Sequence, residues 1–245
     1  MRIVAVSLAL LLPFLLPSPA GAAGPRAEIQ VSLCEPAATI ESRLALRPRG
    51  AAYETWLFDS ASLAMLDRGL RLRLRTNAKG GDLTLKVANQ DCGALPRGAV
   101  PKGEGKCEYD VHGEAIAGAV SLSRALDAAQ TRDLVAGRTT VDALLSPAQV
   151  RYLRDTLQAW PLPEGLRPLG PVANRVYASS RYDVDVSTLP GGQRYTEIAD
   201  KVPLERVAEE REKLARHLER AGVTVCPSQE GQAAAKMKLL LDARK

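Results

Sequence analysis

The sequence predicts an α+β protein in which accessory helices cover an antiparallel β-sheet. Several segments alternate apolar and polar residues with the period of two that is typical of strands, most clearly at residues 70–75. A helical stretch at residues 120–160 separates two groups of such segments, and more helices follow the second group. This order lacks the sustained strand–helix–strand alternation that is typical of a parallel sheet.

The first group of strands is punctuated by turn residues. Lys79, Gly80 and Gly81 predict a hairpin turn between two of its strands, and a glycine- and proline-rich loop is expected at residues 93–105. The strands expected in this group are residues 28–33, 53–58, 70–75, 83–87 and 106–111.

The second half combines helices with the remaining strands. Apolar residues at three-to-four spacing predict helices, and Ser146 followed by Pro147 marks an internal helix start. Gly222 is expected to end the long amphipathic helix before it. The expected helices are residues 122–136, 141–159, 204–221 and 232–243, and the expected strands are residues 175–178, 182–186 and 194–202.

Residues 1–23 have the pattern of a secretory signal peptide. Arg2 precedes an apolar stretch at residues 3–16, and small residues at 20–23 resemble a cleavage site. A retained membrane anchor is the alternative, but the apolar stretch is short for a span and contains Pro13. We therefore expect export to the periplasm or the extracellular space, with no membrane span in the mature protein and one domain over residues 24–245.

Composition excludes several classes of protein. Hydrophobic residues make up 46% of the chain and charged residues 25%, which is typical of a packed globular protein and not of a disordered one. The net charge of +5 is mild and the charges of both signs are interspersed. A generic nucleic-acid binder needs a stronger basic surface, so nucleic acid is not an expected partner.

Four cysteines remain after the leader. An even number in an exported chain predicts two disulfides, and three connectivities are possible. We favour Cys92–Cys107, because the segment between them reads as one hairpin loop, which leaves Cys34–Cys226. A zinc site is disfavoured, since the chain has no C-x-x-C motif and its two histidines, His112 and His217, lack ligand-like spacing to a cysteine.

The polar faces of the expected strands are charged. Arg71, Arg73, Arg75 and Lys86 supply cations, and carboxylates supply the anions on other strands. Two arrangements produce this pattern. The sheet can pack its leucine face on helices and expose the charged face to water, or it can close into a barrel with the charges inside. A closed barrel would suit a polyanion such as a string of phosphates. The strand carboxylates are Glu28, Glu108, Asp110, Asp183, Asp185 and Glu197.

Seven short segments carry the charged residues or mark the strand ends beside them. They are Glu28-Ile29-Gln30-Val31-Ser32, Leu57-Phe58-Asp59-Ser60, Gly69-Leu70-Arg71-Leu72-Arg73, Leu83-Thr84-Leu85-Lys86, Lys106-Cys107-Glu108-Tyr109-Asp110, Asn174-Arg175 and Tyr195-Thr196-Glu197-Ile198-Ala199. In this order they resemble motifs of the CYTH, or triphosphate tunnel metalloenzyme, superfamily, which opens with E-x-E-x-K and closes with E-I-E.

The resemblance implies an eight-stranded antiparallel tunnel, with a first half at residues 27–115, a helical insert at 120–160 and a second half at 172–245. Its interior would bind a small triphosphate-like polyanion, and glutamates would hold Mg²⁺ or Mn²⁺. The register of Asp183 and Asp185 stays open, because a one-residue slip reverses the face. The implied phosphate-binding residues are Arg71, Arg73, Arg75, Lys86 and Arg175, and the implied metal ligands are Glu28, Glu108 and Glu197.

The departures from the family pattern fall on the chemistry. Gln30 and Ser32 replace the second glutamate and the lysine of the opening motif, and Ala199 replaces the second glutamate of the closing one. Fewer carboxylates hold a divalent ion more weakly. Three interpretations follow: an exported metal-dependent phosphohydrolase of triphosphate, polyphosphate or a nucleoside triphosphate; a tunnel that binds a phosphorylated ligand without cutting it; and a structural domain that keeps the scaffold.

The long helix carries an apolar stripe of Val207, Leu214 and Leu218. The stripe is expected to pack on the barrel, and a dimer seam is the alternative. The sequence is thus compatible with a monomer or a homodimer.

Overall fold

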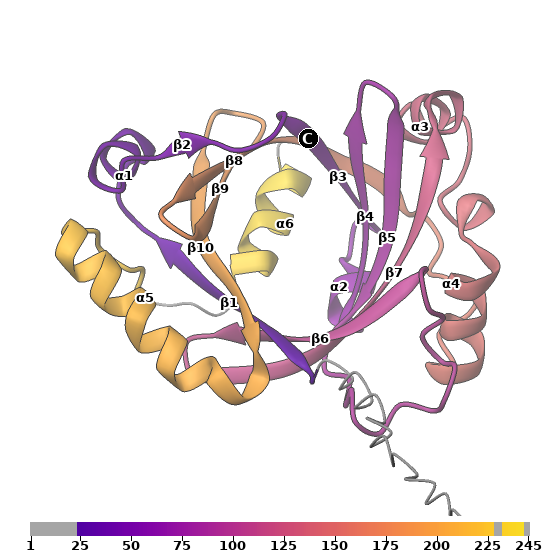
Figure 1. Cartoon of the computed structure of the whole chain (residues 1–245). Coiled ribbons are helices and arrows are strands. Elements are labelled where there is room, and N and C mark those ends of the chain that lie inside the picture. Colours follow the sequence, from indigo (N-terminus) through magenta and orange to yellow (C-terminus); the bar gives the residue numbers. More distant parts are fainter. Residues whose placement is uncertain (1–23, 228–231, 243–245) are drawn as a thin grey trace, which may run out of the picture.

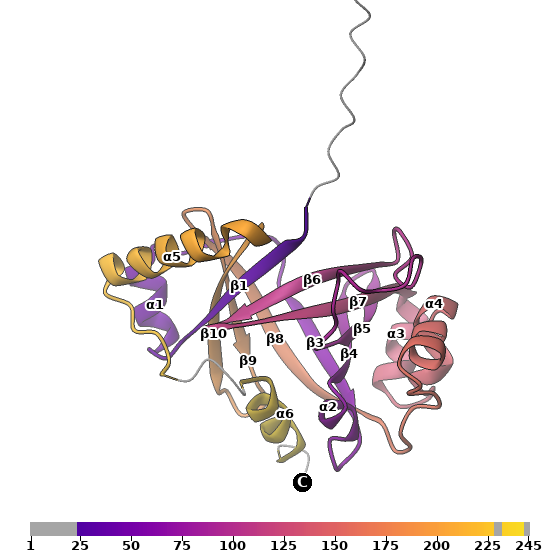
Figure 2. The same ribbon diagram turned by 90° about the horizontal axis from the view of Figure 1, so that it is seen from below.

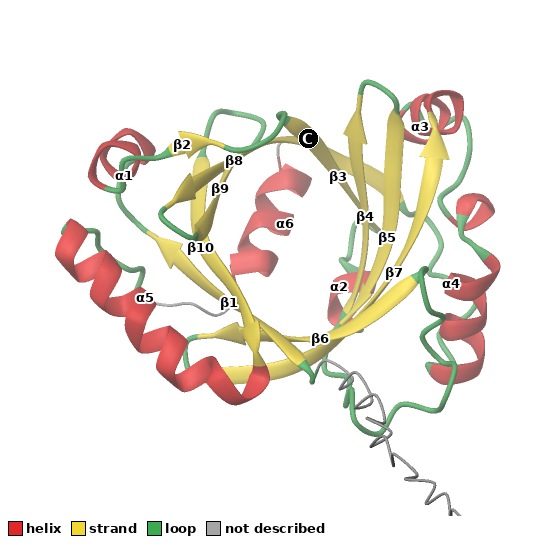
Figure 3. Ribbon diagram, in the orientation of Figure 1, coloured by secondary structure: helices red, strands yellow, loops and turns green. Residues whose placement is uncertain are grey.

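In the computed structural model of the chain, the structure is described for residues 24–227 and 232–242, and the expected signal peptide lies outside this part. Within it, strands form a ring and most helices flank the ring (Figure 3). The strands are β1 (Arg26–Leu33), β2 (Arg47–Pro48), β3 (Tyr53–Asp59), β4 (Leu70–Asn77), β5 (Gly80–Val87), β6 (Gly105–His112), β7 (Ala115–Asp127), β8 (Arg167–Ser179), β9 (Tyr182–Thr188) and β10 (Arg194–Pro203).

The helices are mostly short and follow or interrupt the strands. The α-helices are α1 (Ala37–Arg43), α2 (Ala64–Asp67), α3 (Ala128–Val135), α4 (Pro147–Arg151), α5 (Val207–Ala221) and α6 (Gln232–Asp242). Two 3₁₀ turns, η1 (Asp142–Leu144) and η3 (Leu204–Arg206), and a π-helical turn, η2 (Tyr152–Thr156), complete the described elements.

The sheet closes on itself. Its order is β2-β8-β3-β4-β5-β7-β6-β1-β10-β9, and an additional pairing of β8 with β9 makes a barrel of nine strands with β2 as an extra one (Figure 1). The expected α+β tunnel is confirmed, but its strand number and directions differ from the expected eight antiparallel strands. The first strand, β1, runs parallel to β6 and antiparallel to β10. The pairings of β1 join strands far apart in the chain, so no local pattern reveals them.

One wall of the barrel packs its leucines outward. On this wall, the leucines of β4 form a buried cluster with Leu134 of α3 and Leu153 of η2. The β4 leucines are Leu70, Leu72 and Leu74. Figure 1 places α3 and α4 outside the ring of strands. Because neighbouring residues on a strand point to opposite faces, the arginines between these leucines lie on the inner face of the barrel.

The opposite wall is covered by α5, which lies across β1 and β10 (Figure 2). Its apolar stripe, including Leu214 and Leu218, is buried in one cluster with Ile29 and Ile198. The expectation that this stripe packs on the barrel is confirmed. The same packing fixes the register of β1, so that Glu28, Gln30 and Ser32 share the inner face.

The predicted helix at residues 122–136 is wrong in its first part. Strand β7 continues to Asp127, and α3 begins only at Ala128, where Asp127 and Gln130 form a capping box. The four-residue spacing of Leu122 and Leu126 fits a helix, but both also fit the outward face of a strand. Residues 120–127 adopt the strand conformation because they pair with β5 along their whole length.

Helix α6 packs on the inner face at one end of the barrel, where Figure 2 shows it beside α2. Met237 and Leu240 are buried in a cluster with Leu169 and Leu189, against which Leu57 packs. The strand register places Leu57 opposite Arg73, on the inner face. We call this the α6 end of the barrel; Arg71 lies nearer to it along β4 than Arg75 does.

Two disulfides link the described residues. Cys34–Cys226 joins the end of β1 to the segment after α5, and Cys92–Cys107 closes the loop before β6. Both favoured pairings are confirmed. Among the described residues, no helix has the length and apolar character needed to cross a membrane.

Candidate functional site

Three arginines form a row on the inner face of β4. Arg71 lies directly opposite Lys86, Arg73 opposite Thr84, and Arg75 opposite Asp82 in the β4–β5 ladder. Like charges directly opposite each other on one face of a sheet are destabilising. Lys86 offsets this repulsion through its ion pair with Asp110.

The middle guanidinium of this row lacks a complete set of partners. The Nε of Arg73 is buried and has no hydrogen-bond partner within the described residues. Burial, reinforced by the charges of Arg75 and Arg71, lowers the pKa of Arg73 to about 10. The group still carries its charge at neutral pH, so a buried positive charge with an unsatisfied donor faces the interior.

Tyr53 connects the arginine row to the acidic side of the barrel. The guanidinium carbon of Arg75 lies 5.1 Å from the centre of the Tyr53 ring, a cation–π contact. The hydroxyl of Tyr53 lies 3.5 Å from a carboxylate oxygen of Asp185. Cations from β4 and a carboxylate from β9 thus meet across this ring.

Asp185 lies in an acidic neighbourhood. Burial raises its pKa above the usual aspartate value, Arg75 opposes this increase, and Glu197, Glu28 and Asp183 reinforce it. The β9–β10 register pairs Asp185 with Glu197 and Asp183 with Ala199. This register resolves the open question of the two aspartates, since both share the inner face with Glu197.

Most carboxylates of the other strands are paired with lysines. Lys86 Nζ lies 2.5 Å from an Asp110 oxygen, and Lys201 Nζ lies 3.7 Å from a Glu28 oxygen. Lys106 also forms an ion pair with Glu108. Two of the three expected metal ligands, Glu28 and Glu108, therefore have a cationic partner already.

We tested whether these residues fit a divalent metal ion. Mg²⁺ and Mn²⁺ are held by several carboxylate oxygens that converge on one point. Within residues 24–227 and 232–242, no three Asp, Glu, His or Cys side chains are arranged in this way. Together with the lysine pairing of Glu28 and Glu108, this donor set does not fit the implied ion.

The structure brings most of the expected site residues to one interior, with one exception. Arg71, Arg73, Arg75, Lys86, Glu28, Glu108 and Glu197 share the inner face. Arg175 does not join them, because the β8–β9 register puts Val176 opposite Asp185 and Arg175 opposite Val186. The neighbouring Asn174 points inward instead, where it donates to Thr55 Oγ1 at 3.0 Å.

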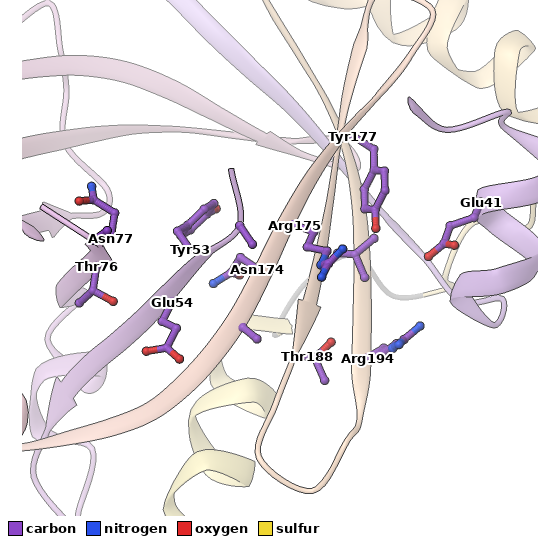
Figure 4. A pocket seen from close by; sticks show the side chains of 14 residues that line it. Glu41, Tyr53, Glu54, Thr76, Asn77, Asn174, Arg175, Tyr177, Thr188 and Arg194 are labelled. Carbon is purple, nitrogen blue, oxygen red and sulfur yellow. The ribbon is translucent and has the colours of Figure 1, made fainter. Parts of the chain in front are cut away.

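Arg175 lines a separate pocket of about 730 Å³ on the outside of β8 and β9. Figure 4 shows Arg175, Tyr177, Thr188 and Arg194 on one side of it, and Tyr53, Glu54, Thr76 and Asn77 on the other. We call it the outer pocket. It has the size of an ordinary small-molecule site.

Sequence reasoning missed two inner-face residues. Tyr53 lies at the start of a strand, and nothing in its neighbourhood along the chain indicates that it stacks on Arg75. The inward position of Lys201 could have been predicted, because residues 197, 199 and 201 share one face of a strand. The pairing of Lys201 with Glu28 depends on the β1–β10 contact, which the strand pattern does not show.

The chain resembles known proteins in structure but not detectably in sequence. No family model and no curated protein sequence matches the chain. An adenylyl cyclase candidate from Hippeastrum, described as having a dominant triphosphatase activity, is similar in structure, with a TM-score of 0.57, 15% identity, and coverage of 86% of this chain and 94% of that one.

A candidate adenylate cyclase from Bacillus halodurans is also similar, with a TM-score of 0.55 and 12% identity over 86% of this chain and 97% of that one. At such identities the likeness concerns the fold. The closed barrel, its inward charges and these two structures together show that the chain has the fold of the CYTH, or triphosphate tunnel, superfamily.

Proposed function

We propose that the inner face of the barrel binds a short phosphate chain of the triphosphate type, and that Arg71, Arg73 and Arg75 hold it. Guanidinium groups form strong, charge-assisted hydrogen bonds with phosphate oxygens. A row of three along one strand suits a ligand that repeats its negative charge along its length.

A single observation carries this proposal, the buried and unpartnered Nε of Arg73. A buried donor on a charged group is costly unless a partner satisfies it. The two flanking arginines make the cost larger, since they repel Arg73. A phosphate chain would supply oxygens to the unpaired donor and would neutralise the three charges together.

Calorimetric titration with tripolyphosphate tests the proposal. The mature, oxidised protein should bind it in EDTA as well as in Mg²⁺, because the arginines and not a metal provide the contacts. Arg73→Gln should weaken binding by roughly tenfold to a hundredfold, the usual effect of removing a hydrogen bond to a charged group in a buried site. Arg73→Lys, which keeps the charge but not the fork of donors, should have an intermediate effect.

Arg132→Gln is the matched control, since this exposed arginine lies on α3, outside the barrel. It should bind tripolyphosphate like the wild type. Failure of the wild type to bind, or equal binding by the Arg73→Gln variant with native circular dichroism, would refute the proposal and leave a structural role for the scaffold.

Hydrolysis of the bound chain is the second candidate. It is supported by the triphosphatase activity described for the Hippeastrum protein and by the carboxylates around Asp185. Phosphate release from tripolyphosphate, ATP and polyphosphate, each with Mg²⁺, Mn²⁺ or EDTA, tests it. Release that disappears in Glu28→Gln/Glu108→Gln would support a metal-dependent hydrolase, and binding without release would support a binding protein.

We also propose that the protein acts after export. Its two disulfides fit an oxidising compartment, and its first 23 residues have the pattern of a secretory leader. Fractionation of cells that produce the full chain, with detection of the mature N-terminus, tests this location.

A further inference from the structure

The outer pocket contains two arginines that form no ion pair with another described residue. Arg175 and Arg194 lie on the same outer face of neighbouring strands, and both line the pocket (Figure 4). Neither guanidinium forms a hydrogen bond or an ion pair with another residue of the described chain. Two such cations in one concave site are suited to an anionic ligand.

The outer pocket begins where the arginine row of the inner face ends. Tyr53 packs its ring on Arg75 and also lines the pocket. Asn77, two residues beyond Arg75 on β4, lines it as well. A ligand that lies along the arginines and extends past Arg75 would therefore reach the pocket over the Tyr53 ring.

The other direction leads to the α6 end of the barrel. Leu57 lies opposite Arg73 on the inner face, and it packs with the cluster that buries Met237 and Leu240 of α6. The α6 side chains in this cluster are apolar, and the same helix also carries Lys236 and an exposed Lys238. A chain longer than the arginine row therefore meets this apolar cluster in one direction and Tyr53 in the other.

We propose that the outer pocket is a second anion subsite, which binds the continuation of a phosphate chain longer than triphosphate through Arg175 and Arg194. This inference rests on the proposed function of the inner face and names its ligand class as linear polyphosphate. Thr76 and Asn77 add neutral donors. Glu41 and Glu54 also line the pocket and oppose an anion, so the affinity of the subsite is limited by their charge.

Two ligands separate the subsite from the inner face. Tripolyphosphate and a linear polyphosphate of tens of units are titrated into the wild type and into Arg175→Ala/Arg194→Ala. The double variant should weaken binding of the long chain by about tenfold, the effect of losing two exposed charge contacts, and leave tripolyphosphate within about twofold. Glu54→Gln should act in the opposite direction and strengthen binding of the long chain only.

Arg132→Ala/Arg151→Ala is the matched control, because both arginines are exposed and lie on α3 and α4, outside the barrel. It removes the same charge and should leave the long chain bound as in the wild type. An equal loss in the control would show general electrostatic attraction and overturn the inference. So would a double variant with unchanged affinity for the long chain.

The inference and the proposed function fail in different ways. If tripolyphosphate binding depends on Arg73, but binding of long polyphosphate does not depend on Arg175 and Arg194, the proposed subsite is wrong and the inner-face site stands. If neither phosphate chain binds the wild type, both are wrong.

Discussion

Arg73 holds a buried charge that its own chain leaves partly unsatisfied. Burial and the adjacent Arg71 and Arg75 lower its pKa, which shows that the folded state disfavours this charge. A residue that only stabilised the barrel would be better replaced by a neutral one. The cost to stability is therefore itself an argument for a ligand.

We predict that Arg73→Gln raises the free energy of unfolding of the ligand-free protein by about 1 kcal/mol, because it removes a buried and repelled charge. Urea denaturation with and without tripolyphosphate measures this. The ligand should stabilise the wild type and not the variant. A destabilised ligand-free variant, with Arg132→Gln unchanged, would contradict this interpretation.

Asp185 competes with any anion that approaches Arg75. Its carboxylate interacts with the Arg75 charge and lies 3.5 Å from the Tyr53 hydroxyl. We predict that Asp185→Asn strengthens tripolyphosphate binding severalfold, since the amide removes a negative charge from the inner face.

The pH dependence follows from the raised pKa of Asp185. As the pH falls, Asp185 is protonated at a higher pH than an ordinary aspartate would be. Its repulsion of the anionic ligand then decreases. Binding by the wild type should therefore strengthen relative to the Asn variant on acidification, with the same ligand at each pH. A constant ratio of the two dissociation constants would contradict this role.

At the scale of single residues, sequence patterns predicted faces well where alternation was regular. Leucine and arginine alternate without interruption over residues 70–75, so one face had to be apolar and the other charged. Arg175 does not lie in such an alternating segment. The face of the sheet on which it lies is determined by the pairing of β8 with β9. Lys106 lies two residues before Glu108 on one face of the same strand, so their proximity follows from alternation, whereas the Lys201 partner of Glu28 depends on the β1–β10 pairing.

Among the helices, α5 is attached to the barrel through a polar contact as well as its apolar stripe. His217 Nε2 lies 3.1 Å from Ser179 Oγ, and the His217 and Tyr182 rings are 5.0 Å apart. Burial, with a smaller effect of Arg220, lowers the pKa of His217 below its ordinary value. The folded state thus disfavours the protonated ring.

We predict that this contact makes stability fall with acidification. Because the pKa of His217 is lower in the folded than in the unfolded state, the unfolded chain binds more protons as the pH falls below about 6.5. The contribution is fully present above that pH and is lost as the pH falls through the folded-state pKa. His217→Gln should reduce the difference in unfolding free energy between pH 7.5 and pH 5, measured in urea; an unchanged difference would contradict the assignment.

Helix existence was easier to predict than helix extent. The amphipathic pattern of residues 204–221 and the Gly222 that follows predicted α5, and the structure ends the helix at Ala221 with Gly222 in the left-handed region. The last part of strand β7, from Leu122 onward, was mistaken for a helix because its leucines satisfy both periods. Its identity depends on hydrogen bonds to β5 and β6, which lie elsewhere in the chain.

For the molecule as a whole, the two disulfides constrain very different lengths of chain. Cys34 and Cys226 are separated by 192 residues, and Cys92 and Cys107 by 15. In the chain-entropy account, a bond that closes a longer loop restricts the unfolded state more. The long-range bond also holds the segment that leads to α6.

We predict that Cys34→Ser/Cys226→Ser lowers the free energy of unfolding by about 2 kcal/mol more than Cys92→Ser/Cys107→Ser. Urea denaturation of the two double variants under oxidising conditions measures the difference. An equal loss, or a larger loss for the short loop, would show that loop entropy does not govern these bonds.

The closed topology also determines how the molecule meets its neighbours. In the described sheet, β2 is the terminal strand; it has only two residues, and Pro48 has no backbone N–H to donate. Long unpaired strands are the usual template for edge-to-edge aggregation. Because the pairing of β8 with β9 closes the barrel, few strand edges stay open, so the folded protein should resist strand-mediated association at high concentration.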